Sequence, residues 1–319
     1  MFKKLFLPVG LVIAIISALI LPDPGIYLKK VGAVPVFIII IFLLNGWHLK
    51  LRESNLNRSF LCTFIAAIVI SLGVGPFIGM GAVELFKLGT LTAVGIIVMS
   101  SVPVTLSSAT VVTEVSGGNS LWALFMTIGL NIVGIFTVPF MVKLGLEDTE
   151  GIDISAGKLL LKLLLLVLLP FLVGYIVKKA TKLGSHVVLR YVPSVCVILT
   201  VYAACGASRE TLMKLAPSEY PLMLGIVFGI HAILFIIAYL YGSIVKLDKP
   251  EKKALAFVSS QKTLPIALSV ISVLPGDSGA AIIPCLLFHF TQLLIDSFVA
   301  AHMSHRDEKP DATGCAVAK

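Results

Sequence analysis

Long runs of apolar residues separated by short polar segments dominate the chain. Ten runs are long enough to cross a membrane as helices, at about 5–22, 31–47, 59–77, 88–113, 119–142, 158–177, 188–206, 220–245, 253–274 and 280–301. The hydrocarbon core of a bilayer is about 30 Å thick and a helix rises about 1.5 Å per residue, so each span needs about 20 apolar residues. The pattern predicts an all-α integral membrane protein with ten transmembrane helices.

Composition agrees with this interpretation. Hydrophobic residues make up 58% of the 319 positions and charged residues 13%, whereas a soluble domain carries about 25% charged residues. Ten spans with short connections use almost the whole chain, which predicts one transmembrane domain with a short cytoplasmic tail at 303–319. We interpret the first run as a helix rather than a cleaved signal peptide, because it is long for the apolar part of such a peptide.

The charge distribution predicts orientation. The formal net charge is +8, and Lys and Arg gather in alternate connections, such as 50–58 and 246–253. Cytoplasmic loops are enriched in these residues, so we expect both termini in the cytoplasm. This arrangement favours a lipid bilayer over a nucleic acid as the partner, and the short loops favour a bacterial inner membrane.

Two polar segments interrupt apolar runs at corresponding places in the two halves of the chain. SSVPVTLSSA begins at Ser100 and SSQKTLPIALS begins at Ser259, 159 positions later. The connections that follow also correspond, GNS at 118–120 and GDS at 276–278, with an offset of 158. Ten spans with both ends on one side divide into two five-helix halves of opposite orientation, the inverted repeat of many transporters.

The expected repeats cover about 1–145 and 155–302, and the interruptions fall in the fourth and ninth spans. Pro103 and Pro265 lack the backbone N–H that a helix requires. Non-helical backbone survives in a membrane only where it is buried in protein or lines a wet cavity. We therefore expect helices 4 and 9 to be broken, to cross, and to form a binding site. The alternative is a pair of ordinary proline kinks that bind nothing.

The candidate binding residues are the polar side chains at the two interruptions and on the spans that follow them. They are Ser107, Ser108, Thr110, Thr127, Asn131, Gln261, Lys262, Thr263, His289, Gln292 and Asp296. Thr127 and Asn131 lie four residues apart on one helix face, although small polar residues also hold membrane helices together.

Lys262 is the most informative candidate. A lysine within a span is costly unless it pairs or reaches an interface. It could be the counter-charge for an anionic substrate, a group that takes up and releases a proton, or a fixed positive charge replacing a coupling cation. The alternative is that it reaches the interface.

The tenth span carries a second polar set, His289, Gln292 and Asp296, on one helix face. Asp296 needs a partner in an apolar span, and Lys262 and His289 are the candidates. This face could equally be a structural hydrogen-bond network. No GxSxG, HExxH or Walker A motif occurs, and the cysteines and histidines lack metal-ligand spacing. The sequence therefore predicts no catalytic residue, no metal and no cofactor.

The runs SSVPVTLSSATVVTEVSGGNSLWALFMT, AFVSSQKTLPIAL and FHFTQLL resemble the bile acid:sodium symporter superfamily, and most closely its SBF-like, member-7-type solute carriers. The resemblance covers nearly the whole chain. It implies a panel domain of helices 1, 2, 6 and 7, a core domain of the other six helices, and crossed, unwound helices 4 and 9. It also implies a substrate between the two domains.

The resemblance also implies where sodium ligands would lie. The Ser-Asn pair of sodium-coupled members falls at Ala109 and Thr110, their threonine at Thr127 and their glutamine at Gln261. Their glutamate falls at Phe257. An ammonium 4 Å from a sodium ion would repel it by roughly 4 kcal/mol at a dielectric constant of about 20, so we expect sodium coupling to be lost or reduced to one weak site.

The leading hypothesis is a secondary transporter of a small organic anion that works by alternating access, with sodium or a proton as the candidate coupling ion. The superfamily spans bile acids, keto acids and other organic anions, so the resemblance leaves the substrate open. The alternatives are a membrane-embedded regulator with little transport, and a cation/proton antiporter-like carrier in which Lys262 or Asp296 titrates.

Overall fold

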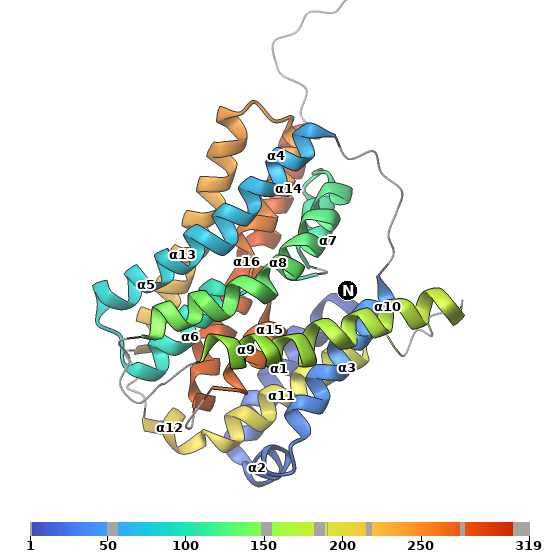
Figure 1. Ribbon diagram of the computed structural model, residues 1–319. Helices are drawn as coiled ribbons and strands as arrows, with labels where there is room; N and C mark the ends of the chain where they lie inside the picture. Colours follow the sequence, from blue (N-terminus) through green and yellow to red (C-terminus); the bar gives the residue numbers. More distant parts are fainter. Residues whose placement is uncertain are drawn as a thin grey trace, which may run out of the picture.

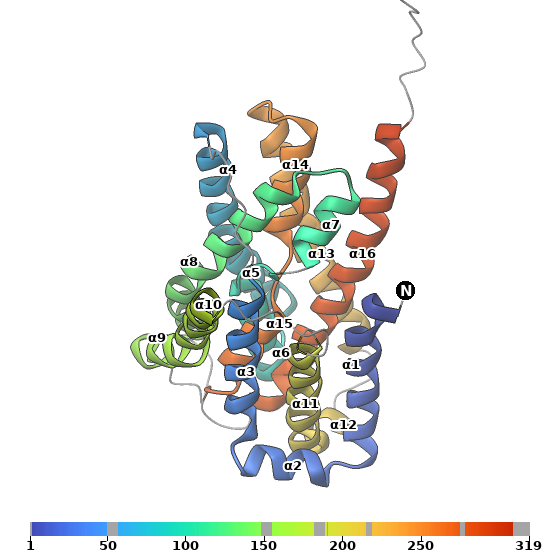
Figure 2. The ribbon, with the colours of Figure 1, turned by 90° about the vertical axis from the view of Figure 1, so that its right-hand side faces the viewer.

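The computed structural model describes residues 2–49, 57–106, 108–147, 155–181, 189, 191–214, 219–274 and 278–308. These residues form helices joined by short connections, and none of them lies in a strand. The helices pack into two groups (Figures 1 and 2).

The first group packs around α3 and α11. It comprises α1 (Phe2–Ile20), α2 (Asp23–Lys30), α3 (Ala33–His48), α9 (Ala156–Leu163), the π-helical turn η2 (Leu164–Leu168), α10 (Leu169–Thr181) and α11 (Val192–Ala207), with the short α12 (Arg209–Lys214) after it. The second group comprises α4 (Arg58–Ile68), the π-helical turn η1 (Val69–Val74), α5 (Gly75–Phe86), α6 (Thr90–Ser101), α7 (Ser108–Val115), α8 (Ser120–Leu146), α13 (Glu219–Ile244), α14 (Lys249–Ser260), α15 (Leu264–Ile271), the 3-10 turn η4 (Ser278–Ala281) and α16 (Ile282–Glu308).

Six of the described helices are long and apolar enough to cross a membrane, and α1 with α2 would make a seventh. The predicted spans 88–113 and 253–274 are each divided into two helices. The bend of 101° between α1 and α2 was not predicted. It places the charged helix Asp23–Lys30 across the end of its group (Figure 2).

Large apolar side chains remain exposed on the outer faces of both groups. Ile13 of α1 is 58% exposed, Ile176 of α10 is 60% exposed, and Phe298 of α16 is 69% exposed. Soluble monomers rarely expose extensive apolar surface. These faces therefore fit the hydrocarbon of a bilayer.

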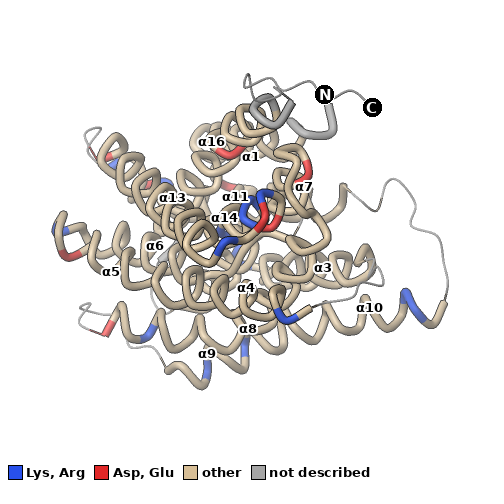
Figure 3. Tube along the Cα trace, turned by 90° about the horizontal axis from the view of Figure 1, so that it is seen from above, with Lys and Arg blue, Asp and Glu red and all other residues tan. Residues whose placement is uncertain are grey.

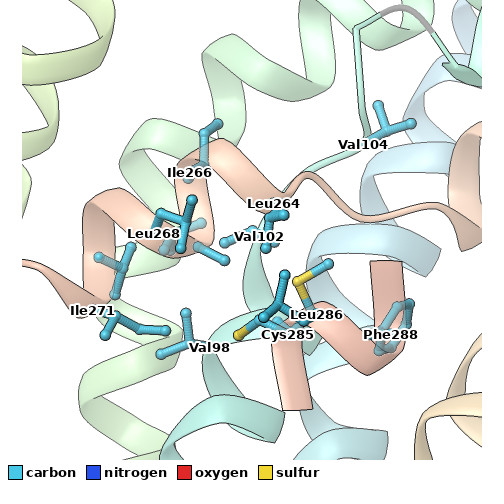
Figure 4. Packing of buried hydrophobic residues seen from close by; sticks show 14 of the residues in the cluster. Val98, Val102, Val104, Leu264, Ile266, Leu268, Ile271, Cys285, Leu286 and Phe288 are labelled. Atoms are coloured by element: carbon cyan, nitrogen blue, oxygen red, sulfur yellow. The ribbon is translucent and has the colours of Figure 1, made fainter. Parts of the chain in front are cut away.

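The apolar core of the second group surrounds the short helix α15. Figure 4 shows its side chains packed against those of α6 and α16. The buried residues labelled there are Val98, Val102, Val104, Leu264, Ile266, Leu268, Ile271, Cys285, Leu286 and Phe288. This packing holds the two breaks in the chain at a fixed position.

Two glycines allow α3 and α10 to approach closely. A side chain added at Gly46 would overlap the Phe171 carbonyl, and one added at Gly174 would overlap the Leu43 carbonyl. Small residues at helix crossings permit this kind of backbone contact in membranes. Backbone atoms cannot move aside as the end of a flexible side chain can.

We expect the substitution Gly174→Val to separate α3 from α10. Overpacking costs about 1–3 kcal/mol or more, which corresponds to a melting temperature lower by roughly 5 °C. The control is Gly225→Val on α13, where an added side chain would meet nothing within 4 Å. Equal melting temperatures for the two variants would contradict the close approach.

Candidate functional site

The two helix breaks meet inside the second group. α6 ends at Ser101 before α7 begins at Ser108, and α14 ends at Ser260 before α15 begins at Leu264. The Thr263 amide donates a 2.8 Å hydrogen bond to the carbonyl of Pro103. A backbone donor of one break thus satisfies a backbone acceptor of the other. Non-helical backbone is stable within a membrane only when its polar groups are satisfied in this way.

An asparagine of α8 supports the first break. The Asn131 side-chain amide donates to the Val104 carbonyl at 2.9 Å and to the Thr127 carbonyl at 2.8 Å. Val104 lies in the non-helical segment between α6 and α7. Asn131 therefore holds the non-helical segment against α8.

A glutamine of α16 supports the second break. The Lys262 amide donates to Gln292 Oε1 at 2.8 Å, and Gln292 Nε2 donates to the Lys262 carbonyl at 2.8 Å. One side-chain amide thereby satisfies both polar groups of a non-helical backbone unit. Gln292 is fully buried.

We expect Gln292→Met to destabilise the protein, because it keeps the length of the side chain but removes both hydrogen bonds. Each unsatisfied buried backbone group costs about 1–3 kcal/mol, so the melting temperature should fall by roughly 5–10 °C. The control is Ser297→Ala on the same helix, since Ser297 is exposed and its hydroxyl bonds only to the Leu293 carbonyl. If the Gln292→Met variant is as stable as the control, the two hydrogen bonds between Gln292 and the Lys262 backbone do not stabilise the fold.

The Lys262 side chain is fully buried and reaches the π-helical turn η1. Its Nζ donates to the Ser71 carbonyl at 2.6 Å and lies 3.2 Å from the Ser71 hydroxyl. The Gly75 amide bonds five residues back to Ile70. In the same register the donor to the Ser71 carbonyl would be the amide of Pro76, and proline has no N–H. The Ser71 carbonyl therefore has no donor from its own helix, and Lys262 Nζ donates to it instead.

No carboxylate among the described residues forms an ion pair with Lys262. Its charge is held by a carbonyl and a hydroxyl, oxygen ligands of the kind that a small metal cation also prefers. The lysine does not reach the interface, so that alternative from the sequence is wrong.

The acidic residue of the site pairs with a histidine from another helix. Asp296 Oδ1 lies 2.9 Å from His231 Nε2, and Asp296 Oδ2 accepts a 2.6 Å hydrogen bond from Gln261 Nε2. His231 Nδ1 lies 3.2 Å from the Ser260 carbonyl. The sequence suggested Lys262 or His289 as the partner of Asp296; the structure places His231 and Gln261 there instead.

The neighbours of the pair limit where its hydrogen-bond donors can lie. The Ser260 carbonyl only accepts hydrogen bonds, and so does an ionised Asp296. Both contacts of the ring are hydrogen bonds only if the pair carries two protons. Either His231 is an imidazolium facing a carboxylate, or a protonated Asp296 donates to a neutral ring. In both cases the pair has no net charge, and loss of one proton breaks one of the two bonds.

Gln261 joins this pair to the first break. Its Oε1 accepts hydrogen bonds of 2.8 Å from the Thr105 and Ser108 hydroxyls, which also contact each other. A continuous chain of buried polar groups therefore runs from α13 through α16 and the second break to the first. Movement of either break would therefore disturb the hydrogen bonds along this whole chain of polar groups.

Comparison with known proteins now assigns the chain. The model of the SBF-like CPA transporter family matches residues 6–305. The chain belongs to the SBF-like CPA transporter family. It is therefore a multi-pass integral membrane transporter and not an enzyme.

Relatives of this SBF-like chain extend from plants to bacteria and animals. It is 27% identical to the probable sodium/metabolite cotransporter BASS4, chloroplastic, of Arabidopsis thaliana, over 92% of this chain and 71% of the relative. It is 23% identical to the uncharacterized sodium-dependent transporter YocS of Bacillus subtilis, over 78% and 75%. It is 22% identical to the sodium/bile acid cotransporter 7 of Mus musculus, over 92% and 91%.

The SBF-like chain has an aromatic side chain where the resemblance places a sodium-binding glutamate. Phe257 is fully buried and packs edge-on against Phe235, with ring centroids 5.2 Å apart. Ala109, at the position of the corresponding serine, is also fully buried. Neither side chain offers an oxygen ligand.

The structure brings most of the predicted residues together. Pro103, Ser108, Gln261, Lys262, Thr263, Gln292 and Asp296 lie at or against the crossing of the breaks, and Pro265 lies in the first turn of α15. The hydroxyls of Thr110 and Thr127 and the Nε2 of His289 have no hydrogen-bond partner among the described residues, whereas His289 Nδ1 lies 3.3 Å from Gln292 Nε2. Ser107 lies outside the described residues.

Three residues of the site were not predicted as binding residues. Ser71 and Thr105 are hydroxyl residues of a common kind, and Thr105 stood in the polar segment around Pro103 without being singled out. His231 lies in an apolar run with no charged neighbour, 65 positions from its partner. The one signal in the sequence is that Asp296 has no partner in its own span, which predicts a polar partner on another helix.

A narrow cavity lies between the two helix groups, beside the first break. Its volume is about 20 Å³, close to that needed by a single water molecule. Leu106 and Asn131 line its second-group side, and Phe42 and Phe171 line its first-group side. Only a relative movement of the groups would open it to a larger solute.

Proposed function

We propose that the chain is a secondary transporter of a small organic anion, with the substrate bound between the two helix groups at the crossed breaks. The observation that carries this proposal is the hydrogen bond from Thr263 to Pro103, which joins two broken helices beside the fully buried Lys262 ammonium. Half-helix ends and freed carbonyls near the centre of a membrane protein are the usual means of binding a charged solute.

We propose ten spans arranged as a 5+5 inverted-topology repeat. The six long candidates, the α1–α2 pair and the three shorter apolar helices Ala33–His48, Thr90–Ser101 and Val192–Ala207 together make ten. α6 ends at Ser101 and α14 ends at Ser260, the offset of 159 found in the sequence. The first helix group then corresponds to the panel domain and the second to the core domain.

We propose that both termini lie on the cytoplasmic side, in a bacterial inner membrane. The support is the gathering of Lys and Arg in alternate connections. Cysteine labelling from each side of sealed vesicles, at a residue of the 246–253 connection, tests the orientation. Labelling of that residue from the outside of intact cells would contradict it.

Sodium coupling is not part of this proposal. Phe257 offers no ligand, and the Lys262 side chain is buried at the second break with its Nζ against the Ser71 carbonyl. A positive charge on this side chain would take over the electrostatic role of a bound cation. An anionic solute would then be attracted without a co-transported sodium ion.

A second candidate function is proton-coupled transport. The His231–Asp296 pair supports it, because a buried carboxyl and imidazole in direct contact can exchange a proton, and both contacts of the ring are hydrogen bonds only with two protons on the pair. Two further buried titratable side chains belong to the same polar region: Lys262, next to Gln261, and His289, which contacts Gln292. Release of a proton would leave a net negative charge beside Gln261, which the solute or a cation could sense.

Uptake into proteoliposomes tests both candidates. Labelled pyruvate, glycolate and taurocholate serve as probes, with an imposed sodium gradient, an imposed pH gradient, or neither. We expect uptake of at least one probe without sodium, and stimulation by the pH gradient if protons are coupled. Strict dependence on sodium would contradict the coupling proposal, and no uptake of any tested anion would favour a regulatory role.

A further inference from the structure

A large pocket opens at the end of the molecule where α13 ends, α14 begins and α16 ends. Its volume is about 620 Å³, far larger than that of the cavity beside the first break. It is lined by Tyr239, Lys249, Lys252, Lys253, Phe298, Val299, His302 and Met303. Figures 1 and 2 show the three contributing helix ends at the same end of the molecule, away from the break crossing.

The charge of this pocket has one sign. Lys249, Lys252 and Lys253 come from the first turns of α14, and no Asp or Glu is among the described residues that line the pocket. Glu251 of the same turn accepts a hydrogen bond from Asn119 instead. Figure 3, viewed onto this end, shows the basic and acidic positions at the start of α14.

Two of the lysines contact neutral groups that help to position them. Lys252 Nζ lies 4.6 Å from the centre of the Tyr239 ring and 3.2 Å from the Ser243 hydroxyl. Lys253 is buried and donates to the Ser116 carbonyl. These contacts hold the two side chains in place at the pocket, so the pocket presents a preformed lining rich in lysine.

The opposite wall is apolar. It is formed by Phe298, Val299 and Met303 of α16, and Phe298 is 69% exposed on the outer face of the group. α16 and α13 are both long enough to cross a membrane, so a pocket at their ends lies near the level of the lipid headgroups. A free phosphate ion would use the lysines and leave the apolar wall in water.

We propose that this pocket binds an anionic phospholipid, with the phosphate at Lys249, Lys252 and His302 and an acyl chain along Phe298. Basic pockets between membrane helices hold anionic headgroups through charge-assisted hydrogen bonds. The lipid would bridge α13, α14 and α16, and α14 leads directly to the second break at Gln261. The site is independent of the transported solute.

The test is thermal unfolding of the full-length protein in detergent with phosphatidylglycerol, phosphatidylcholine or inorganic phosphate added. A ligand that binds only the folded state raises the melting temperature. We expect phosphatidylglycerol to raise it by about 5 °C, and phosphatidylcholine and phosphate to have little effect. If phosphate raises the melting temperature equally, the pocket binds a free anion. If phosphatidylcholine raises it equally, the charge of the headgroup does not determine binding. Either result overturns the proposal.

The variant K249Q/K252Q is expected to lose most of the phosphatidylglycerol shift. The matched control is K87Q/K143Q, which removes two exposed lysines that do not line the pocket. Native mass spectrometry gives a second readout that does not depend on stability, namely the number of phosphatidylglycerol molecules retained. Equal retention by the two double variants would overturn the proposal.

Discussion

Lys262→Met is expected to lower solute uptake at least about 100-fold, which corresponds to roughly 2.7 kcal/mol. The ammonium is the buried positive charge of the crossing, and it lies against Ser71 with no described carboxylate to neutralise it. Methionine keeps much of the volume of the side chain but offers no charge to an anion. Uptake of the anion that the proteoliposome screen identifies measures the effect.

The fold should survive this change. Loss of the ammonium leaves the Ser71 carbonyl unsatisfied, at a cost of about 1–3 kcal/mol, but it also removes a charge from the protein interior. The matched control is Lys162→Met, because Lys162 also lies within a candidate span but is exposed on α9. Normal uptake by Lys262→Met would return the lysine to a purely structural role.

Asp296→Ala is expected to be the most destabilising single change in the site. It leaves His231 and Gln261 without their shared hydrogen-bond partner in a fully buried position. Breaking a buried charged pair costs about 3–5 kcal/mol, so the melting temperature should fall by roughly 10 °C. Thermal unfolding in detergent measures the fall.

A double-mutant cycle separates the pair from its surroundings. His231→Ala combined with Asp296→Ala should cost clearly less than the sum of the two single changes, because the second change removes a partner that the first has already left unsatisfied. Asp296→Asn should be milder than Asp296→Ala, since its side chain still accepts one hydrogen bond. Strict additivity of the two alanine substitutions would contradict a direct interaction.

The sequence predicted the helix breaks because their signals are local. Pro103 and Pro265 each lie among polar residues within an apolar run, and a buried backbone without its N–H needs some other partner. The contact between the breaks was predicted from their corresponding places in the two proposed halves of the chain. The Thr263–Pro103 hydrogen bond shows that the breaks touch.

The partners of the charged residues were harder to predict. Asp296 was correctly expected to need a partner, but His231 shares no sequence spacing with it, and only the packing of α13 on α16 brings them together. The acceptor for Lys262 depends on the π-helical turn before Pro76, which frees the Ser71 carbonyl. A shift of one residue in helical register leaves no trace in a hydropathy pattern.

Binding of radioactive sodium to the purified protein tests the central claim most directly, because it needs no knowledge of the substrate. If the Lys262 ammonium takes the place of a coupling cation at the crossed breaks, the wild-type protein should show no saturable sodium binding above that of an empty-detergent control. Saturable binding that excess unlabelled sodium displaces and choline does not would contradict the account.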